Sequence, residues 1–167
     1  VADAIPASQA EQVVNVSGLY VVPGLIDLHT HLYATSGMQG AWAGDSSVLP
    51  DGFSFRTGAT TLVDAGSSGW RNFEDFRLRV IDRATTRVFA MLNITGLGML
   101  TDVPEQNIRD MDPKATAEMA LKHKDVVVGI KSAHYQGPEW VSVDRAVEAG
   151  TSANIPVMVD FGYFLQE

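Results

Sequence analysis

The sequence predicts an α/β fold built around a parallel sheet. Five short apolar runs rich in Val, Ile and Leu recur along the 167 residues, and amphipathic stretches separate the last four of them. Continuous apolar runs are typical of parallel strands, which are covered on both faces, and strands that alternate with helices favour a parallel connection. With 46% hydrophobic and 19% charged residues, the chain can bury a core between such layers.

The expected strands span residues 19–28, 60–64, 87–94, 126–131 and 156–161. Upstream of the first strand, residues 1–18 carry few helical cues, and we interpret them as the end of a different module. Residues 19–167 then form a second unit, in which strands and helices alternate.

Three helices are expected between the later strands. The apolar residues of 72–84 fall on one side, with Arg and Asp residues opposite. The second helix, residues 113–124, follows Asp112, which can cap a helix whose first position is a proline. The third, residues 141–149, should end at Gly150, because glycine commonly terminates helices.

Composition excludes several classes of partner. The net charge of −8 and the lack of a Lys/Arg cluster argue against nucleic acid, since phosphate recognition needs a basic surface. No apolar run approaches the ~18 residues of a membrane span, so we expect a soluble protein without a membrane partner. The compartment stays open between cytoplasmic and exported, because the sequence starts at Val1 and a leader could have been removed. The lack of cysteine restricts any metal site to nitrogen and oxygen ligands.

Two histidines mark the end of the first expected strand. Side chains alternate along a strand, so Asp27, His29 and His31 point to one face. Two imidazoles at the carboxyl end of a buried strand suit a divalent metal ion, and the alternative is a pair of ordinary polar residues leaving a strand. We favour the metal site because the pair follows an apolar run and a Pro-Gly turn. Asp27 could then accept an imidazole N–H.

Three segments resemble a known family. Residues 18–31, Gly-Leu-Tyr-Val-Val-Pro-Gly-Leu-Ile-Asp-Leu-His-Thr-His, look like the first barrel strand of the amidohydrolase superfamily, the metal-dependent hydrolases that include dihydroorotases, deacetylases and phosphotriesterases. Asp51 and residues 58–69, Gly-Ala-Thr-Thr-Leu-Val-Asp-Ala-Gly-Ser-Ser-Gly, continue the match. Residues 126–131, Val-Val-Val-Gly-Ile-Lys, resemble the strand that carries the family's carboxylated lysine. The segments stand in the family's order and are most similar to its amidohydrolase/deacetylase-type members.

The resemblance implies a (β/α)8 TIM barrel, of which residues 19–167 supply about five of the eight strands. It also implies that residues 1–18 are the tail of a small β-sandwich that flanks the barrel. We therefore interpret the chain as a fragment that is inactive alone. Its expected partners are a small-molecule substrate and the missing strands of its own barrel, and a homo-oligomer is left open.

The same resemblance implies the ligands of one or two zinc ions. His29 and His31 would hold one ion with an aspartate of the eighth strand, and a carbamate on Lys131 would bridge to a second. Burial would lower the pKa of Lys131 and free its neutral amine for carbon dioxide, whereas the alternative is a lysine that reaches solvent. Asp160 stands where members of the group usually have histidine, so it either ligates the second metal or lies at the mouth of the site. The general base, an aspartate after strand eight, is expected beyond this chain.

Two further residues are candidates for supporting roles. Asp64 leaves the second strand just before a Gly-Ser-Ser-Gly segment and could orient the loop backbone or ligands. His134 follows Lys131 in a loop of the kind that contacts substrate in barrels, and the alternative is an ordinary loop histidine with its hydrogen bonds satisfied. His123 lies between two lysines on an expected helix and should face solvent.

These residues predict a hydrolase in which metal-activated water cleaves an amide or ester bond. A phosphotriesterase-like activity uses the same chemistry, and it stays open because the loops that set specificity include some beyond this chain. The other alternative is a non-catalytic barrel that has lost part of its metal site. Asp160 alone supports that alternative, and the retention of His29, His31 and Lys131 argues against it.

Overall fold

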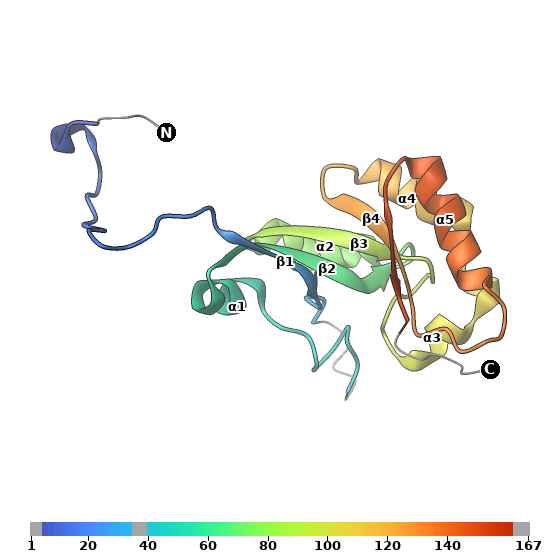
Figure 1. Cartoon of the computed structure of the whole chain (residues 1–167). Helices are drawn as coiled ribbons and strands as arrows, with labels where there is room; N and C mark the ends of the chain where they lie inside the picture. Colours follow the sequence, from blue (N-terminus) through green and yellow to red (C-terminus); the bar gives the residue numbers. More distant parts are fainter. Residues whose placement is uncertain (1–4, 35–39, 162–167) are drawn as a thin grey trace.

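The computed structural model describes residues 5–34 and 40–161. Its five strands pair in parallel and follow one another across the sheet in sequence order, which confirms the predicted arrangement. The sheet curls into part of a barrel, and helices cover its outer side (Figure 1). The elements in chain order are η1 (Ala7–Gln9), β1 (Leu25–Thr30), α1 (Pro50–Thr57), β2 (Ala59–Gly69), α2 (Phe73–Arg79), η2 (Ile81–Arg83), β3 (Arg87–Asn93), α3 (Asp102–Gln106), η3 (Ile108–Asp110), α4 (Pro113–Lys122), β4 (Val127–Ala133), α5 (Val141–Ala153) and β5 (Val157–Asp160).

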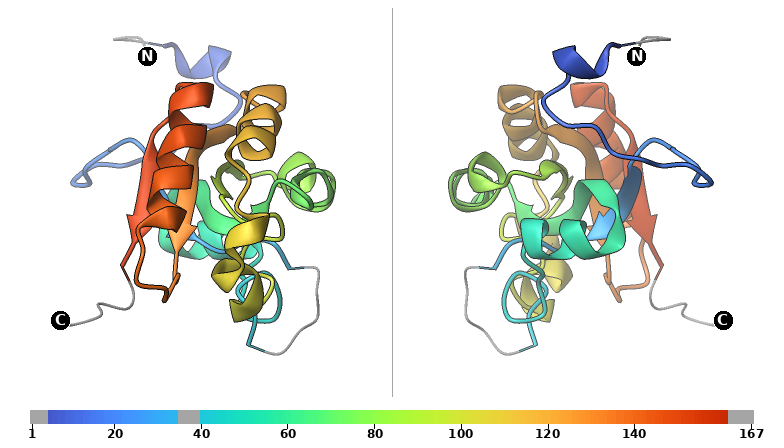
Figure 2. Two further views of the ribbon diagram at one scale, coloured as in Figure 1. Left: turned by 90° about the vertical axis from the view of Figure 1, so that its right-hand side faces the viewer. Right: turned by 90° about the vertical axis from the view of Figure 1, so that its left-hand side faces the viewer.

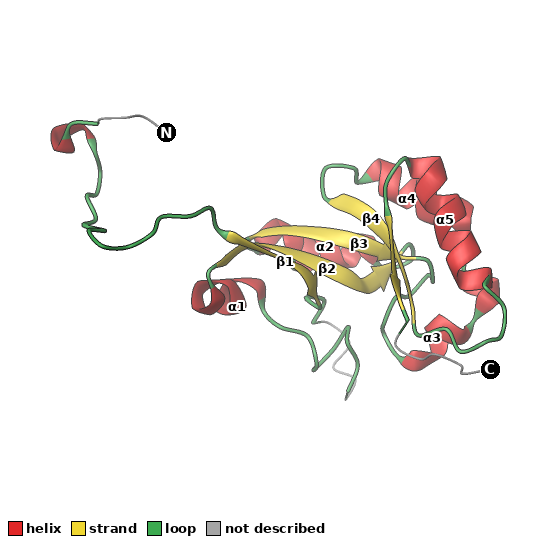
Figure 3. Cartoon of the chain, viewed as in Figure 1, coloured by secondary structure: helices red, strands yellow, loops and turns green. Residues whose placement is uncertain are grey.

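The first strand is shorter than predicted. β1 begins at Leu25, where its register with Ala59 of β2 starts, and residues 19–24 are exposed and belong to no strand. Within the described residues no neighbouring strand lies beside 19–24, so the prediction of a strand there is wrong. Residues 5–24 run as a segment whose only helical turn is η1 (Figure 3). Their assignment to a flanking β-sandwich stays a prediction.

The second strand is longer than predicted. β2 continues five residues beyond Asp64 to Gly69, which pairs with Asn93 of β3 after a register shift. A Cβ on Gly69 would lie 1.7 Å from the carbonyl oxygen of Thr95, so only glycine allows this close approach. The Gly-Ser-Ser-Gly segment is therefore strand and not loop, because neighbouring backbone covers it.

The three predicted helices are present as α2, α4 and α5, but all three end at residues other than those predicted, and α2 and α4 are shorter than expected. The helices α1 and α3 were not predicted. Asp112 caps α4, since its carboxylate accepts the N–H three residues on at 3.0 Å. α5 does not end at Gly150 but runs to Ala153, and Asn154, at φ 55°, forms the left-handed end. Gly150 has a packing role instead, because a Cβ there would lie 2.8 Å from the Val157 side chain of β5. None of the described helices is long and apolar enough to cross a lipid bilayer.

The hydrophobic core lies between the sheet and the helices. Leu62, Leu92 and Ile130 of the strands are fully buried, and Phe73 and Phe76 of α2 belong to the same cluster. α4 and α5 lie side by side and add buried alanines to it (Figure 2). Each large apolar side chain contributes ~1.5–3 kcal/mol by its burial. This layer therefore fixes the strands whose carboxyl ends carry the candidate site.

Candidate active site

Polar side chains from three strands meet at the carboxyl edge of the sheet. The rings of His29 and His31, at the end of β1, have their centroids 5.5 Å apart. Asp160 ends β5, and its Oδ2 lies 3.9 Å from Nε2 of His29 and 3.4 Å from Nζ of Lys131 on β4. The structure thus brings together the four residues that were predicted as metal ligands.

Both imidazoles are neutral at neutral pH. Burial, with His29 and Lys131 nearby, lowers the pKa of His31 to about 4. Partial burial and Lys131 also lower the pKa of His29, although Asp160 opposes the shift. Neutral imidazole is the form that binds a metal ion, so these surroundings favour metal ligation.

Lys131 is fully buried, which rules out the alternative of a lysine that reaches solvent. Its ammonium nitrogen lies 3.5 Å from the Met158 sulfur as well as near Asp160. Burial lowers the pKa of Lys131, and the carboxylate of Asp160 opposes this shift. A lysine with a lowered pKa is the chemical requirement for carbamate formation.

The donor set suits a metal ion but is incomplete in the part of the chain that the structure describes. Across residues 5–34 and 40–161, no three His, Cys, Asp or Glu side chains gather closely enough to hold a metal. The nitrogen and carboxylate donors present are the types that zinc accepts. They therefore fit a site whose remaining ligands come from elsewhere.

Asp27 and Asp64 both bind backbone groups. Asp27 was predicted to accept an imidazole N–H, but its Oδ1 accepts the main-chain N–H of His29 at 3.0 Å. Asp64 is fully buried, and its carboxylate accepts the backbone N–H groups of Leu32, Gly66 and Ser67 at 2.8–3.1 Å. Burial raises the pKa of Asp64 to about 6, and the hydrogen bonds that it accepts oppose the shift.

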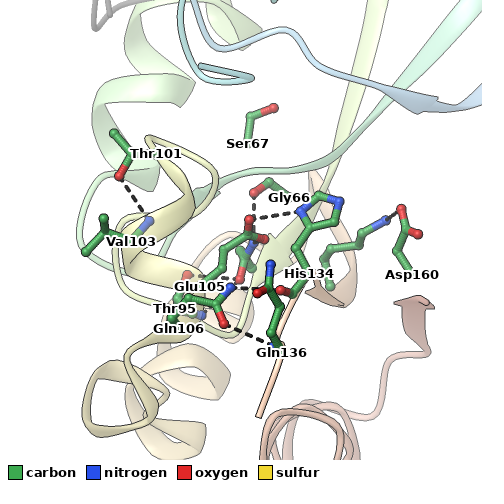
Figure 4. A network of polar contacts seen from close by, with 12 residues as sticks. Gly66, Ser67, Thr95, Thr101, Val103, Glu105, Gln106, His134, Gln136 and Asp160 are labelled. Atoms are coloured by element: carbon green, nitrogen blue, oxygen red, sulfur yellow. Dashed lines mark hydrogen bonds and ion pairs between the residues drawn. The ribbon is translucent and has the colours of Figure 1, made fainter. Parts of the chain in front are cut away.

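His134 pairs with a buried carboxylate that the sequence analysis missed. Its Nδ1 lies 2.9 Å from Oε2 of Glu105, which belongs to α3 and is 1% exposed. Glu105 also accepts from the amide of Asn93 at 3.3 Å, and His134 has a left-handed backbone at φ 56°. The hydrogen bond to Glu105 raises the pKa of His134. In the view of Figure 4 the imidazole of His134 lies between Glu105 and Asp160.

Sequence reasoning missed Glu105 and Ser67 for different reasons. Glu105 is one glutamate in a five-residue helix that contains a proline, and its burial depends on distant strands. Ser67, which contacts His31, lies in a segment that was expected to be a loop. The small residues 65–69 show no strand periodicity, so the sequence carried no signal that would have placed Ser67 in the sheet.

His123 was predicted to face solvent, and this prediction is wrong. The residue is 9% exposed, its ring lies 5.1 Å from that of Phe73, and Nδ1 lies 3.0 Å from Nη1 of Arg77. His123 ends α4 where the chain turns toward the sheet, so its ring packs against α2.

Comparison with known proteins finds relatives that match most of the chain. The chain is 31% identical to a deacetylase of Agrobacterium fabrum over 97% of its own length and 40% of that relative. It is 32% identical to a deacetylase of Brucella anthropi over 87% of the chain and 36% of that protein. The chain therefore spans less than half the length of these curated relatives. No protein-family model matches it.

Solved structures give a consistent result. An adenine deaminase matches with a TM-score of 0.71 and 25% identity, over 81% of this chain and 36% of that protein. A dihydroorotase matches with a TM-score of 0.68 and 27% identity, over 82% of this chain and 38% of that protein.

Proposed function

Since the chain belongs to the amidohydrolase superfamily, we propose that it provides the metal-binding part of a (β/α)8 barrel hydrolase that cleaves amide or ester bonds. The observation that carries the proposal is the convergence of His29, His31, Lys131 and Asp160 at the carboxyl edge of the sheet. In barrels of this kind the active site lies at that edge. The deacetylase relatives make acetylated compounds the first substrates to test.

Each residue has a distinct proposed role. His29 and His31 hold a divalent ion, with zinc favoured by their nitrogen donors. When bound, such an ion polarises the scissile carbonyl and activates a water molecule. The lowered pKa values keep both imidazoles ready for ligation at neutral pH. The general base is proposed to come from a part of the barrel outside this chain.

Lys131 is proposed to carry a carbamate. Its neutral amine adds carbon dioxide and releases one proton, which leaves an anion with two oxygens that can bridge metal ions. Full burial of the side chain supports this step, because burial favours the neutral amine. Asp160 would then be a ligand of the second ion, at the position where the family usually has histidine.

One observation favours a second candidate function. The ammonium of Lys131 already has a carboxylate partner, since Asp160 lies 3.4 Å away. A lysine held in this ion pair does not need a metal ion for charge balance. A site with a single metal ion, or a binding barrel without catalysis, is therefore the alternative.

The test uses the full-length protein in which this sequence occurs. Metal content is measured by mass spectrometry, and hydrolysis of N-acetyl and O-acetyl compounds is measured before and after chelation. We expect one or two metal equivalents and activity that returns with zinc. His29→Ala should remove both, whereas Leu28→Ala, on the opposite face of the same strand, should keep both. No bound metal after growth with zinc, or full activity of His29→Ala, would overturn the proposal.

A further inference from the structure

A pocket opens beside the candidate metal ligands. It has a volume of about 330 Å³ and lies between the loop that follows β4, the start of α5 and the end of β5. His134 and Asp160 both line the pocket, so it adjoins the side chains that converge at the carboxyl edge of the sheet. Pockets for small molecules typically have ~300–1,000 Å³ and are lined mostly by apolar side chains. This pocket is therefore large enough for one part of a substrate.

Large apolar side chains form one wall of the pocket. The rings of Trp140 and Phe161 have their centroids 5.9 Å apart in an edge-to-face arrangement. Trp140 is 63% and Phe161 48% exposed, and apolar side chains that cluster and stay exposed commonly mark a ligand site. The buried serines that also line the pocket, Ser132 and Ser142, hydrogen-bond to each other at 3.2 Å. An apolar occupant can therefore cover the two rings without leaving a serine hydroxyl unpaired.

The charged groups that line the pocket already have partners. Glu139 accepts a hydrogen bond from the Tyr135 hydroxyl at 3.2 Å, and Asp160 lies 3.4 Å from the ammonium nitrogen of Lys131. The imidazole in the lining is paired with Glu105. Among the described residues, no Lys or Arg side chain lines the pocket. An uncharged group therefore suits this lining better than a carboxylate or an ammonium, which would be buried without a partner of its own.

The loop wall of the pocket is held in place by α3 (Figure 4). His134 has φ 56°, which is uncommon for a residue other than glycine. The side-chain amide of Gln106 donates to the carbonyl of His134 at 2.8 Å and accepts the N–H of Gln136 at 3.0 Å. The neighbouring residue, Glu105, holds the imidazole at 2.9 Å. Both the backbone and the ring are thus fixed from α3, so the pocket is formed before a ligand binds.

We propose that this pocket holds the uncharged, apolar alcohol or amine part of an acetylated substrate. The acetyl group itself is small and the same in every such compound, so the part that leaves is the part that a pocket of this size can select. Trp140 and Phe161 then determine specificity through the apolar area that they cover. The identity of the occupant as part of a substrate rests on the proposed function, whereas the binding of an uncharged apolar group does not.

The first measurement is binding of benzyl alcohol to the full-length protein at pH 7, followed by NMR of the tryptophan indole N–H groups. We expect the Trp140 signal to shift. The Trp70 signal should stay in place, because that indole is outside the pocket and donates to the Asp110 carbonyl. Benzoate and benzylammonium carry the same ring with a charge and should bind more weakly. No shift at Trp140, or tighter binding of either charged compound, would overturn the proposal.

The second measurement compares kcat/KM for methyl, isobutyl and benzyl acetate. Each buried methylene is expected to add about fourfold, so isobutyl acetate should exceed methyl acetate by up to ~50-fold. Trp140→Ala should bring this preference close to one. The matched control is Phe55→Ala, which removes another exposed aromatic ring, on α1 and away from the pocket, and should keep the preference. Both side chains are exposed, so neither change should prevent folding.

The two measurements separate the pocket from the proposed function. Equal kcat/KM for the three esters, or a preference that survives in Trp140→Ala, would overturn the pocket as a substrate site while the hydrolase stands. If no ester is hydrolysed but benzyl alcohol shifts the Trp140 signal, the proposed function fails and the pocket stands as a site for an uncharged apolar group.

Discussion

A methyl group added at Gly66 would test how closely β2 and β4 approach each other at the site. Gly66 has φ 92°, and a Cβ there would lie 2.6 Å from Cγ and 2.8 Å from Cβ of Lys131. Lys131 is fully buried, so its aliphatic part cannot move aside into solvent. A positive φ costs alanine ~1–2 kcal/mol, and overpacking a buried site costs ~1–3 kcal/mol. We expect Gly66→Ala to lower the free energy of unfolding by about 2–5 kcal/mol.

Two other glycines separate these contributions. Gly58, which ends α1, has φ 74° but open space where a Cβ would lie, so Gly58→Ala reports the cost of backbone strain alone. Gly52 lies inside α1 with ordinary φ and open space around it. Gly52→Ala should leave stability unchanged or raise it by up to ~1 kcal/mol, because alanine is the better helix former.

Urea unfolding curves of the three variants give the comparison. The difference between Gly66→Ala and Gly58→Ala isolates the contact with Lys131. If Gly66→Ala is no less stable than Gly58→Ala, then the close packing of Gly66 on Lys131 is refuted. If Gly66→Ala fails to fold while Gly58→Ala folds, this outcome supports the close packing of Gly66 on Lys131.

Three further outcomes are expected. Burial raises the pKa of Asp64 to about 6, so its carboxyl stabilises the fold most below about pH 4 and loses this contribution as pH rises through about 6. In urea unfolding, the stability difference between the original protein and Asp64→Asn should therefore change by up to ~3 kcal/mol over that range. A constant difference would contradict the burial of Asp64. Asp112→Ala removes the cap of α4 and should cost ~0.5–2 kcal/mol, measured by thermal unfolding, with no loss contradicting the capping role. Glu105→Gln removes the carboxylate that raises the pKa of His134, so an NMR titration should show that pKa lowered, and an unchanged value would show that the pair is absent in solution.

The parallel order of the strands was predictable because it depends on local patterns. A continuous apolar run of strand length, such as residues 126–131, indicates a strand that is covered on both faces, and β4 is buried along almost its whole length. The end of β1 carries its own evidence in the two alternating histidines. The start of β1 was misplaced because residues 19–22 are as apolar as a strand, although the Pro-Gly pair at 23–24 marks the break directly before Leu25.

The supporting residues of the site depend on contacts that are distant in sequence. Glu105 reaches His134 across 29 positions, and Ser67 reaches His31 across 36. A carboxylate or a hydroxyl is common at the surface, and only its burial distinguishes it. His123 shows the reverse error, since flanking lysines suggested exposure while the end of α4 turned the ring inward.

The curl of the sheet sets the distance between ligands at its two edges. In a flat sheet, β1 and β5 would be separated by four strand spacings, or about 19 Å. Curvature and side-chain reach instead place Nε2 of His29 3.9 Å from Oδ2 of Asp160. Any ion that bridges the two strands therefore binds the curved sheet in preference to a flatter one. The binding free energy of that ion therefore stabilises the curved form of the sheet. A change that makes the sheet harder to bend should weaken ion binding by the same free energy.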